Sequence, residues 1–80
     1  MTRAEVHEKL TGVFRKVFDQ PSLVIGDATT AKDVEGWDSL AHVSLVVAVE
    51  KAFGVRFTTK EVKALANVGD FLELIQRRAK

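Results

Sequence analysis

The segment SLAHVSLVVAVEKAF, residues 39–53, constrains the fold most, because it predicts a helix with apolar side chains on two separate sides. At about 100° per residue, one group of apolar positions falls within a stripe of ordinary core width. This core stripe consists of Leu45, Val46, Val49 and Phe53. A second group lies on another side of the helix, among polar neighbours. This outer stripe consists of Leu40, Val43 and Val47.

Two interpretations of the outer stripe remain open. A helix that is apolar nearly all round is usually buried, which would make residues 39–53 the central helix of the domain. In a chain of 80 residues, however, burial on every side would need neighbours that a small bundle hardly supplies. We therefore favour a helix that buries its core stripe and keeps its outer stripe exposed for a partner.

Length and composition describe a single small globular domain over residues 1–80, with 46% of residues hydrophobic and 29% charged. Spanning a membrane takes an apolar run of about 18 residues or more, and every apolar run here is shorter. The N-terminus, MTRAEVHEKL, carries charges where a signal peptide would have its apolar core. We therefore expect a cytoplasmic monomer without a membrane span.

Cysteine and histidine usage narrows the chemistry. The chain has no cysteine, so we expect no disulfide and no thiolate nucleophile. Its two histidines, His7 and His42, are too few to indicate a metal cluster. Formal net charge is +1, and the sequence lacks the clustered exposed aromatic residues that nucleic-acid binding through Arg56, Lys60, Lys63 and the basic C-terminal residues would need. Nucleic-acid binding is therefore not expected either.

The first helix and the connection after it are marked by their flanking residues. Thr2 followed by Glu5 fits a capping box, and Pro21 disfavours helix at the residue before it, so this helix should end near Asp19. Residues 21–38 then form a loop whose length is uncommon in compact domains and often functional. We expect this loop to be ordered, because several apolar side chains can pin it to the core. They are Val24, Ile25, Val34 and Trp37.

Three more helices should follow. The second begins at Ser39, which is suited to cap it, and ends near Phe53 before Gly54. A second capping-box spacing at residues 58–61 predicts a short helix, and Asn67 can cap the last one. The predicted fold is all-α, a small bundle of three main helices plus one short helix, with a long ordered loop between the first and second helices. Its core should unite Phe14, Leu45, Val49, Phe53, Leu72 and Ile75.

Ser39 also invites comparison with a serine hydrolase, because His42 lies three residues on and Asp38 lies beside it. A hydrolase nucleophile needs a strand–turn–helix setting with flanking glycines, which this sequence lacks. A chain this small also has little room for a substrate pocket with an oxyanion hole. We therefore expect no catalytic residues and assign His42 to the boundary of the core.

The order of motifs resembles that of an acyl carrier protein. GWDSL, residues 36–40, opens an apolar helix that ends at Phe53 and Gly54, and the resemblance continues through VRFTTKEV and NVGDFLELI. The tripeptide Asp-Ser-Leu arises often by chance. The resemblance becomes specific to this family when the tripeptide occurs together with the loop before it and the helix after it.

This resemblance implies a covalent cofactor. A phosphopantetheinyl transferase would move 4′-phosphopantetheine from coenzyme A onto Ser39, and acyl groups would then travel as thioesters on the thiol of that arm. The resemblance assigns Asp38 to contact with the transferase, and the outer stripe to contact with acyl-loading and acyl-using enzymes. We expect Glu35 to add a local polar contact to these partners.

The sequence departs from this family in its charges. Most acyl carriers are strongly acidic along the second helix, whereas this chain has Ala41 and Ser44 there, and Lys51 follows the single Glu50. The departure favours a specialised carrier, serving a dedicated synthase or acyltransferase in fatty acid or polyketide biosynthesis. The alternative is an unmodified helical interaction module that uses the same outer stripe.

Overall fold

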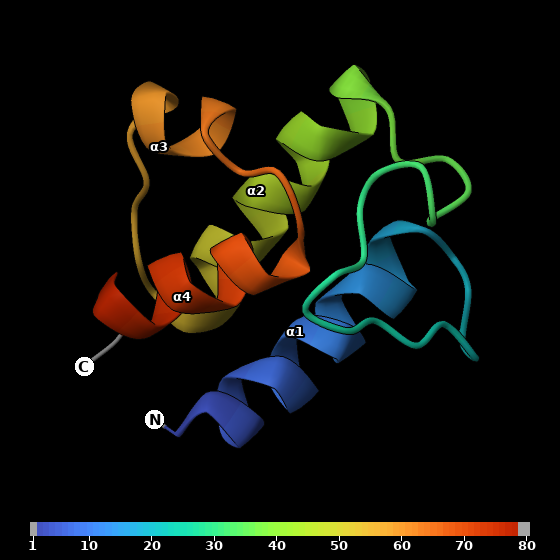
Figure 1. The fold of residues 1–80 in the computed structure, drawn as a ribbon, viewed down its shortest axis with the longest axis horizontal. Helices are drawn as coiled ribbons and strands as arrows, with labels where there is room; N and C mark the ends of the chain where they lie inside the picture. The colour runs from blue at the N-terminus through green and yellow to red at the C-terminus, as the bar shows by residue number, and fades with distance from the viewer. Residues whose placement is uncertain (1, 79–80) are drawn as a thin grey trace.

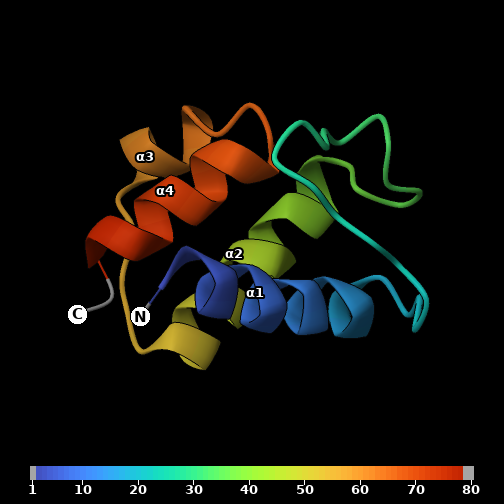
Figure 2. The ribbon, with the colours of Figure 1, turned by 60° about the horizontal axis from the view of Figure 1, so that its bottom comes forward.

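The computed structural model describes residues 2–78 and contains four helices over that range. They are α1 (Arg3–Val17), α2 (Ser39–Phe53), α3 (Thr59–Lys63) and α4 (Val68–Arg78). α1 packs against both α2 and α4, and the loop of residues 18–38 lies at the end of the molecule where α2 begins (Figures 1 and 2). The predicted all-α bundle is confirmed. Over residues 2–78, no helix combines the length and the apolar character needed to cross a membrane.

Two capping boxes begin helices where the sequence predicts them. At α1, the hydroxyl of Thr2 accepts from the backbone N–H of Glu5, and the Glu5 carboxylate accepts from the backbone N–H of Thr2. Thr58 and Glu61 repeat this exchange at α3. Each box satisfies two N–H groups that have no partner inside the helix, which explains why a helix as short as α3 forms.

The bounds of α2 match the prediction, but its cap does not. Asp38, and not Ser39, is the N-cap: its backbone is extended, and its carboxylate accepts from the N–H of Ala41 at 2.8 Å. Ser39 is the first helical residue. A capping side chain must reach the N–H of the second or third helical residue, and Asp38 has that position. At the other end, Gly54 adopts the left-handed conformation, with φ 65°, that ends the helix.

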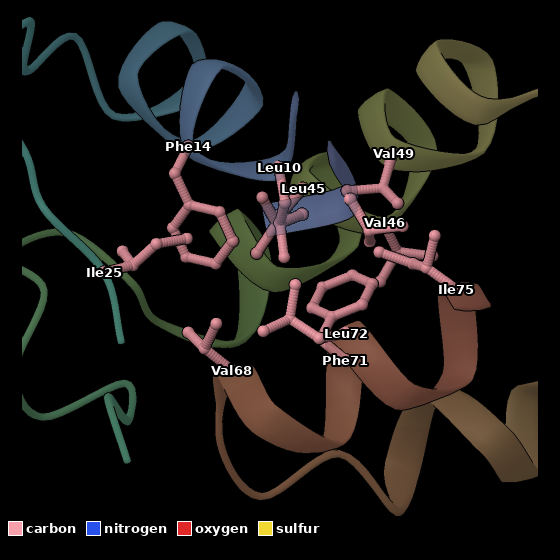
Figure 3. Close-up of a cluster of buried hydrophobic side chains, with 11 residues drawn as sticks. Leu10, Phe14, Ile25, Leu45, Val46, Val49, Val68, Phe71, Leu72 and Ile75 are labelled. Carbon is pink, nitrogen blue, oxygen red and sulfur yellow. The ribbon is translucent and has the colours of Figure 1, made fainter. Parts of the chain in front are cut away.

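The core lies where α1, α2 and α4 meet (Figure 3). Its buried cluster consists of Val6, Leu10, Phe14, Ile25, Leu45, Val46, Val49, Val68, Phe71, Leu72 and Ile75. One predicted core residue differs, because Phe53 is only partly buried. It stands at the last turn of α2, and the Lys9 ammonium lies 5.0 Å from the centroid of its ring. Phe53 therefore packs at the edge of the core.

The long loop is anchored by three of its four predicted residues. Ile25 and Val34 are buried, and Trp37 is partly buried, with its ring edge-to-face against Phe14 at a centroid distance of 5.2 Å. Val24 is 77% exposed, so its predicted role as an anchor is wrong. Residues 23–26 form no helix or turn, and in extended backbone neighbouring side chains point to opposite sides. Burying Ile25 therefore turns Val24 outward.

Hydrogen bonds tie the same loop to both neighbouring helices. A ring nitrogen of His7, on α1, lies 2.6 Å from the carbonyl oxygen of Ile25. On α4, the N–H of Gly69 donates to the carbonyl oxygen of Asp27 at 2.8 Å. Only glycine permits this approach without a shift, because a Cβ at residue 69 would stand 2.9 Å from the Asp27 oxygen. The loop is thus fixed at the end of the bundle where α2 begins.

Candidate functional site

Ser39 is exposed at the N-terminal end of α2. The first N–H groups of a helix have no partner within it, so this end is positively polarised and favours a negatively charged substituent. Asp38 and Glu35, the two acidic residues predicted beside it, are also exposed. The Gln20 side chain donates to the carbonyl oxygen of Glu35 at 3.1 Å, which holds the loop next to the serine. Another protein can therefore reach the Ser39 hydroxyl.

The outer stripe of α2 faces solvent. Leu40 is 81% exposed, Val43 59% and Val47 43%. On the other side of the helix, three residues of the core stripe are buried: Leu45, Val46 and Val49. The interpretation of α2 as a helix buried on all sides is therefore wrong. Three large apolar side chains on one exposed helical face, beginning next to Ser39, are typical of a surface kept for protein contact.

His42 belongs to a hydrogen-bonded chain that links the loop, α2 and α3. The indole N–H of Trp37 donates to Nδ1 of His42 at 3.0 Å, and the planes of the two rings are inclined by 18°. In the neutral imidazole the proton then stands on Nε2, which faces the carbonyl oxygen of Val62 at 3.4 Å. Both ring nitrogens are engaged away from Ser39. His42 is therefore not oriented to act as a base for Ser39.

A groove of about 840 Å³ runs between α2 and α3, with Ser39 and Asp38 at one end. Most of its lining is apolar, and Glu50 lies farther along α2. The carboxylate of Glu50 is partly buried and accepts from the backbone N–H of Phe57 at 2.8 Å. The lining also includes Trp37, His42, Val43, Val46, Val47, Phe57, Val62 and Lys63.

The sequence-based reasoning missed this groove. It expected little room for a pocket, and it assigned no site role to residues 55–65. A signal was present, because Phe57, Val62 and Leu65 are apolar in a segment whose helix is too short to bury them all. In the structure they are partly buried at the margin of the core.

Comparison with known proteins identifies the family. Residues 8–75 match the family model for the phosphopantetheine attachment site. The acyl carrier proteins of Thermosynechococcus vestitus and Acidothermus cellulolyticus are 34% and 33% identical to this chain, over 98% and 94% of its length and 96% and 89% of theirs. This chain belongs to the acyl carrier protein family.

The fold of this acyl carrier is similar to a solved relative. The holo acyl carrier protein of Geobacter metallireducens, determined in solution by NMR, superposes with a TM-score of 0.86 at 38% identity. The match covers 91% of this chain and 84% of that one. The resemblance drawn from GWDSL and the order of helices is therefore confirmed.

Family membership also establishes the class of activity. Acyl carrier proteins are carriers and not catalysts, and their cofactor is a covalently attached 4′-phosphopantetheine. The described residues fit such a group, because an exposed hydroxyl stands at the positively polarised end of α2 and an apolar groove begins beside it.

Proposed function

We propose that this acyl carrier bears its phosphopantetheine arm on Oγ of Ser39 and carries acyl groups as thioesters on the arm's thiol. The observation that carries this proposal is the place of Ser39: it is exposed as the first residue of α2, inside the matched region 8–75. In the loading step the hydroxyl oxygen bonds to the pantetheine-side phosphorus of coenzyme A. The bond from that phosphorus to the nucleotide breaks, and adenosine 3′,5′-bisphosphate leaves.

The chain itself contributes binding and position to this step. The N-terminal end of α2 stabilises the phosphodiester anion by about 0.3–1 kcal/mol. Asp38 keeps that end ordered by capping it, and its exposed carboxylate is available to the phosphopantetheinyl transferase. The groove beside Ser39 gives the arm and its cargo an apolar surface away from water.

Recognition by acyl-loading and acyl-using enzymes falls to the outer stripe, with Asp38 and Glu35 as polar contacts at its N-terminal end. We further propose a specialised carrier that acts as a monomer in the cytoplasm, where coenzyme A is available. The support for specialisation is the charge of α2. Within residues 39–53, Glu50 is the one acidic residue, and its carboxylate is committed to the N–H of Phe57.

The test is incubation of the purified protein with coenzyme A and a broad-specificity phosphopantetheinyl transferase, read by intact-protein mass. Wild type should gain one phosphopantetheine and Ser39→Ala none. Ser44→Ala is the matched control, because Ser44 is another exposed serine on α2, and it should load like wild type. Loading of Ser39→Ala would refute the assignment. Wild type unmodified by several transferases would favour the unmodified interaction module instead.

A further inference from the structure

The C-terminal end of the outer stripe is surrounded by positive charge. Val47, partly exposed, lines both the groove beside Ser39 and a second, smaller depression at the end of α2, of about 490 Å³. Lys63 lines the groove, and Lys51 and Arg56 line the second depression. All three basic residues are exposed. A partner that covers Val47 therefore approaches three cations.

The two carboxylates of the same region accept hydrogen bonds from other parts of the protein. Glu50 lines both depressions, but it is partly buried and its carboxylate accepts from the N–H of Phe57. Glu61 on α3 accepts from the guanidinium of Arg78 and from the backbone N–H of Thr58. Glu61 is paired with Arg78, and the three exposed cations around Val47 outnumber Glu50, so the surface there is net basic.

The other end of the outer stripe has the opposite charge. Asp38, the exposed N-cap of α2, stands two residues before Leu40, and exposed Glu35 lies three residues earlier in the loop. Leu40 and Lys51 are eleven positions apart on α2, which corresponds to about 16 Å along the axis. Leu40, Val47 and Lys51 also fall on one side of the helix, within about 40° of one another. The docking face is therefore acidic at the end with Ser39 and basic at the far end.

We infer that the partner of this face is a protein surface with an apolar centre and with carboxylates placed to meet Lys51, Arg56 and Lys63. This inference rests on the proposed function, which sets the partner's entrance for the arm at Ser39. The carboxylate that meets Lys51 would then lie about 18 Å from that entrance, in the direction of α2. Opposite charges across an interface fix the register of docking, whereas like charges in contact reject wrong partners.

The experiment uses the unmodified full chain and a pair of designed amphipathic helical peptides. The peptides share one leucine face and differ only in the charged residues beside it, which are glutamates in one peptide and lysines in the other. Binding is measured by 15N–1H NMR titration at low salt. The glutamate peptide should bind about three- to tenfold more tightly, and it should shift the amide signals of Val47 and Lys51.

Charge reversal tests the location of the effect. Lys51→Glu, and separately Lys63→Glu, should reduce or reverse the preference, while the control Lys16→Glu, at an exposed position on α1, should keep it. A short DNA duplex tests the alternative of a polyanion site and should leave the signals of Val47 unshifted. Equal binding of both peptides, an effect of Lys16→Glu as large as that of Lys51→Glu, or DNA binding at Val47 would each overturn the inference.

Ser39→Ala separates this inference from the proposed function. The variant should lose phosphopantetheine loading and keep its preference for the glutamate peptide. Loss of the preference in wild type with loading intact would overturn the inference alone. Absence of loading in wild type would overturn the proposed function and the spacing measured from Ser39, and would leave the preference for carboxylates standing.

Discussion

Replacing His42 with leucine should destabilise the protein by removing the acceptor for Trp37. In the structure the indole N–H of Trp37 donates to Nδ1 of His42 at 3.0 Å, between the loop and α2. Leucine leaves that donor without its partner. Asparagine is the matched control, because its side-chain oxygen stands near the position of Nδ1 and its helix propensity is similar to that of histidine.

The size of this loss of stability depends on how deeply Trp37 and His42 are buried. An unsatisfied buried donor costs about 1–3 kcal/mol. Trp37 and His42 are only partly buried, so water reaches some of this site and the low end applies, about 1 kcal/mol. The weaker contact from Nε2 to the Val62 oxygen, at 3.4 Å, adds little. For a domain of this size, such a loss lowers the melting temperature by roughly 4–8 °C.

The assay is thermal and urea unfolding followed by tryptophan fluorescence, since Trp37 is the one tryptophan of the chain. His42→Leu should unfold at a lower temperature and a lower urea concentration than wild type, and the emission wavelength of Trp37 in the native state should shift. His42→Asn should restore most of both signals. If His42→Leu matches wild type in stability and in emission, or if His42→Asn loses as much as His42→Leu, the hydrogen bond does not stabilise the loop as argued.

Two further predictions concern capping and pH. Asp38→Ala should lower the free energy of unfolding by about 0.5–2 kcal/mol, whereas Ser39→Ala should change it by less than about 0.5 kcal/mol. Urea unfolding measures both free energies. A larger loss for Ser39→Ala than for Asp38→Ala would show that the serine is the cap. The hydrogen bond from Arg78, with one from the N–H of Thr58, lowers the pKa of Glu61 from 4.5 to about 2. Because the folded pKa lies below the unfolded one, the stabilisation by ionised Glu61 is complete above about pH 4.5 and lost as the pH falls through about 2. Glu61→Gln should therefore unfold at lower urea than wild type at pH 7, by a margin that narrows from pH 4.5 downward; a constant margin would contradict this.

Local rules account for most of the fold that the sequence predicts. Capping boxes and the Gly54 cap involve residues that are neighbours in the chain, so their spacing alone locates the helix ends within about two residues. The core stripe of α2 and its exposed outer stripe likewise follow from helical periodicity. Where two residues compete for one role, local rules are weaker: both Asp38 and Ser39 are good caps, and the backbone chooses Asp38.

Features that depend on contacts between residues far apart in the chain are harder to predict from the sequence. The burial of Phe53 depends on how α1 crosses the end of α2, and the orientation of Val24 depends on which loop neighbour reaches the core. The groove depends on the placement of α3 against α2, a contact that involves His42 and Val62, twenty residues apart in the chain. No periodicity within one helix encodes these distances.

Glu50 shows why charge on a recognition helix needs the structure as well as the sequence. Counted along the chain, it is the acidic residue that a partner of α2 would meet, and it nearly balances Lys51. In the fold, its carboxylate turns toward residues 55–57 and accepts from the N–H of Phe57, a bond that holds the segment leading to α3. At this end of α2, Lys51 and Arg56 are exposed beside the partly buried Glu50. A helix of nearly balanced composition thus presents Lys51 more openly than Glu50, because Lys51 is exposed whereas the partly buried Glu50 carboxylate turns toward residues 55–57.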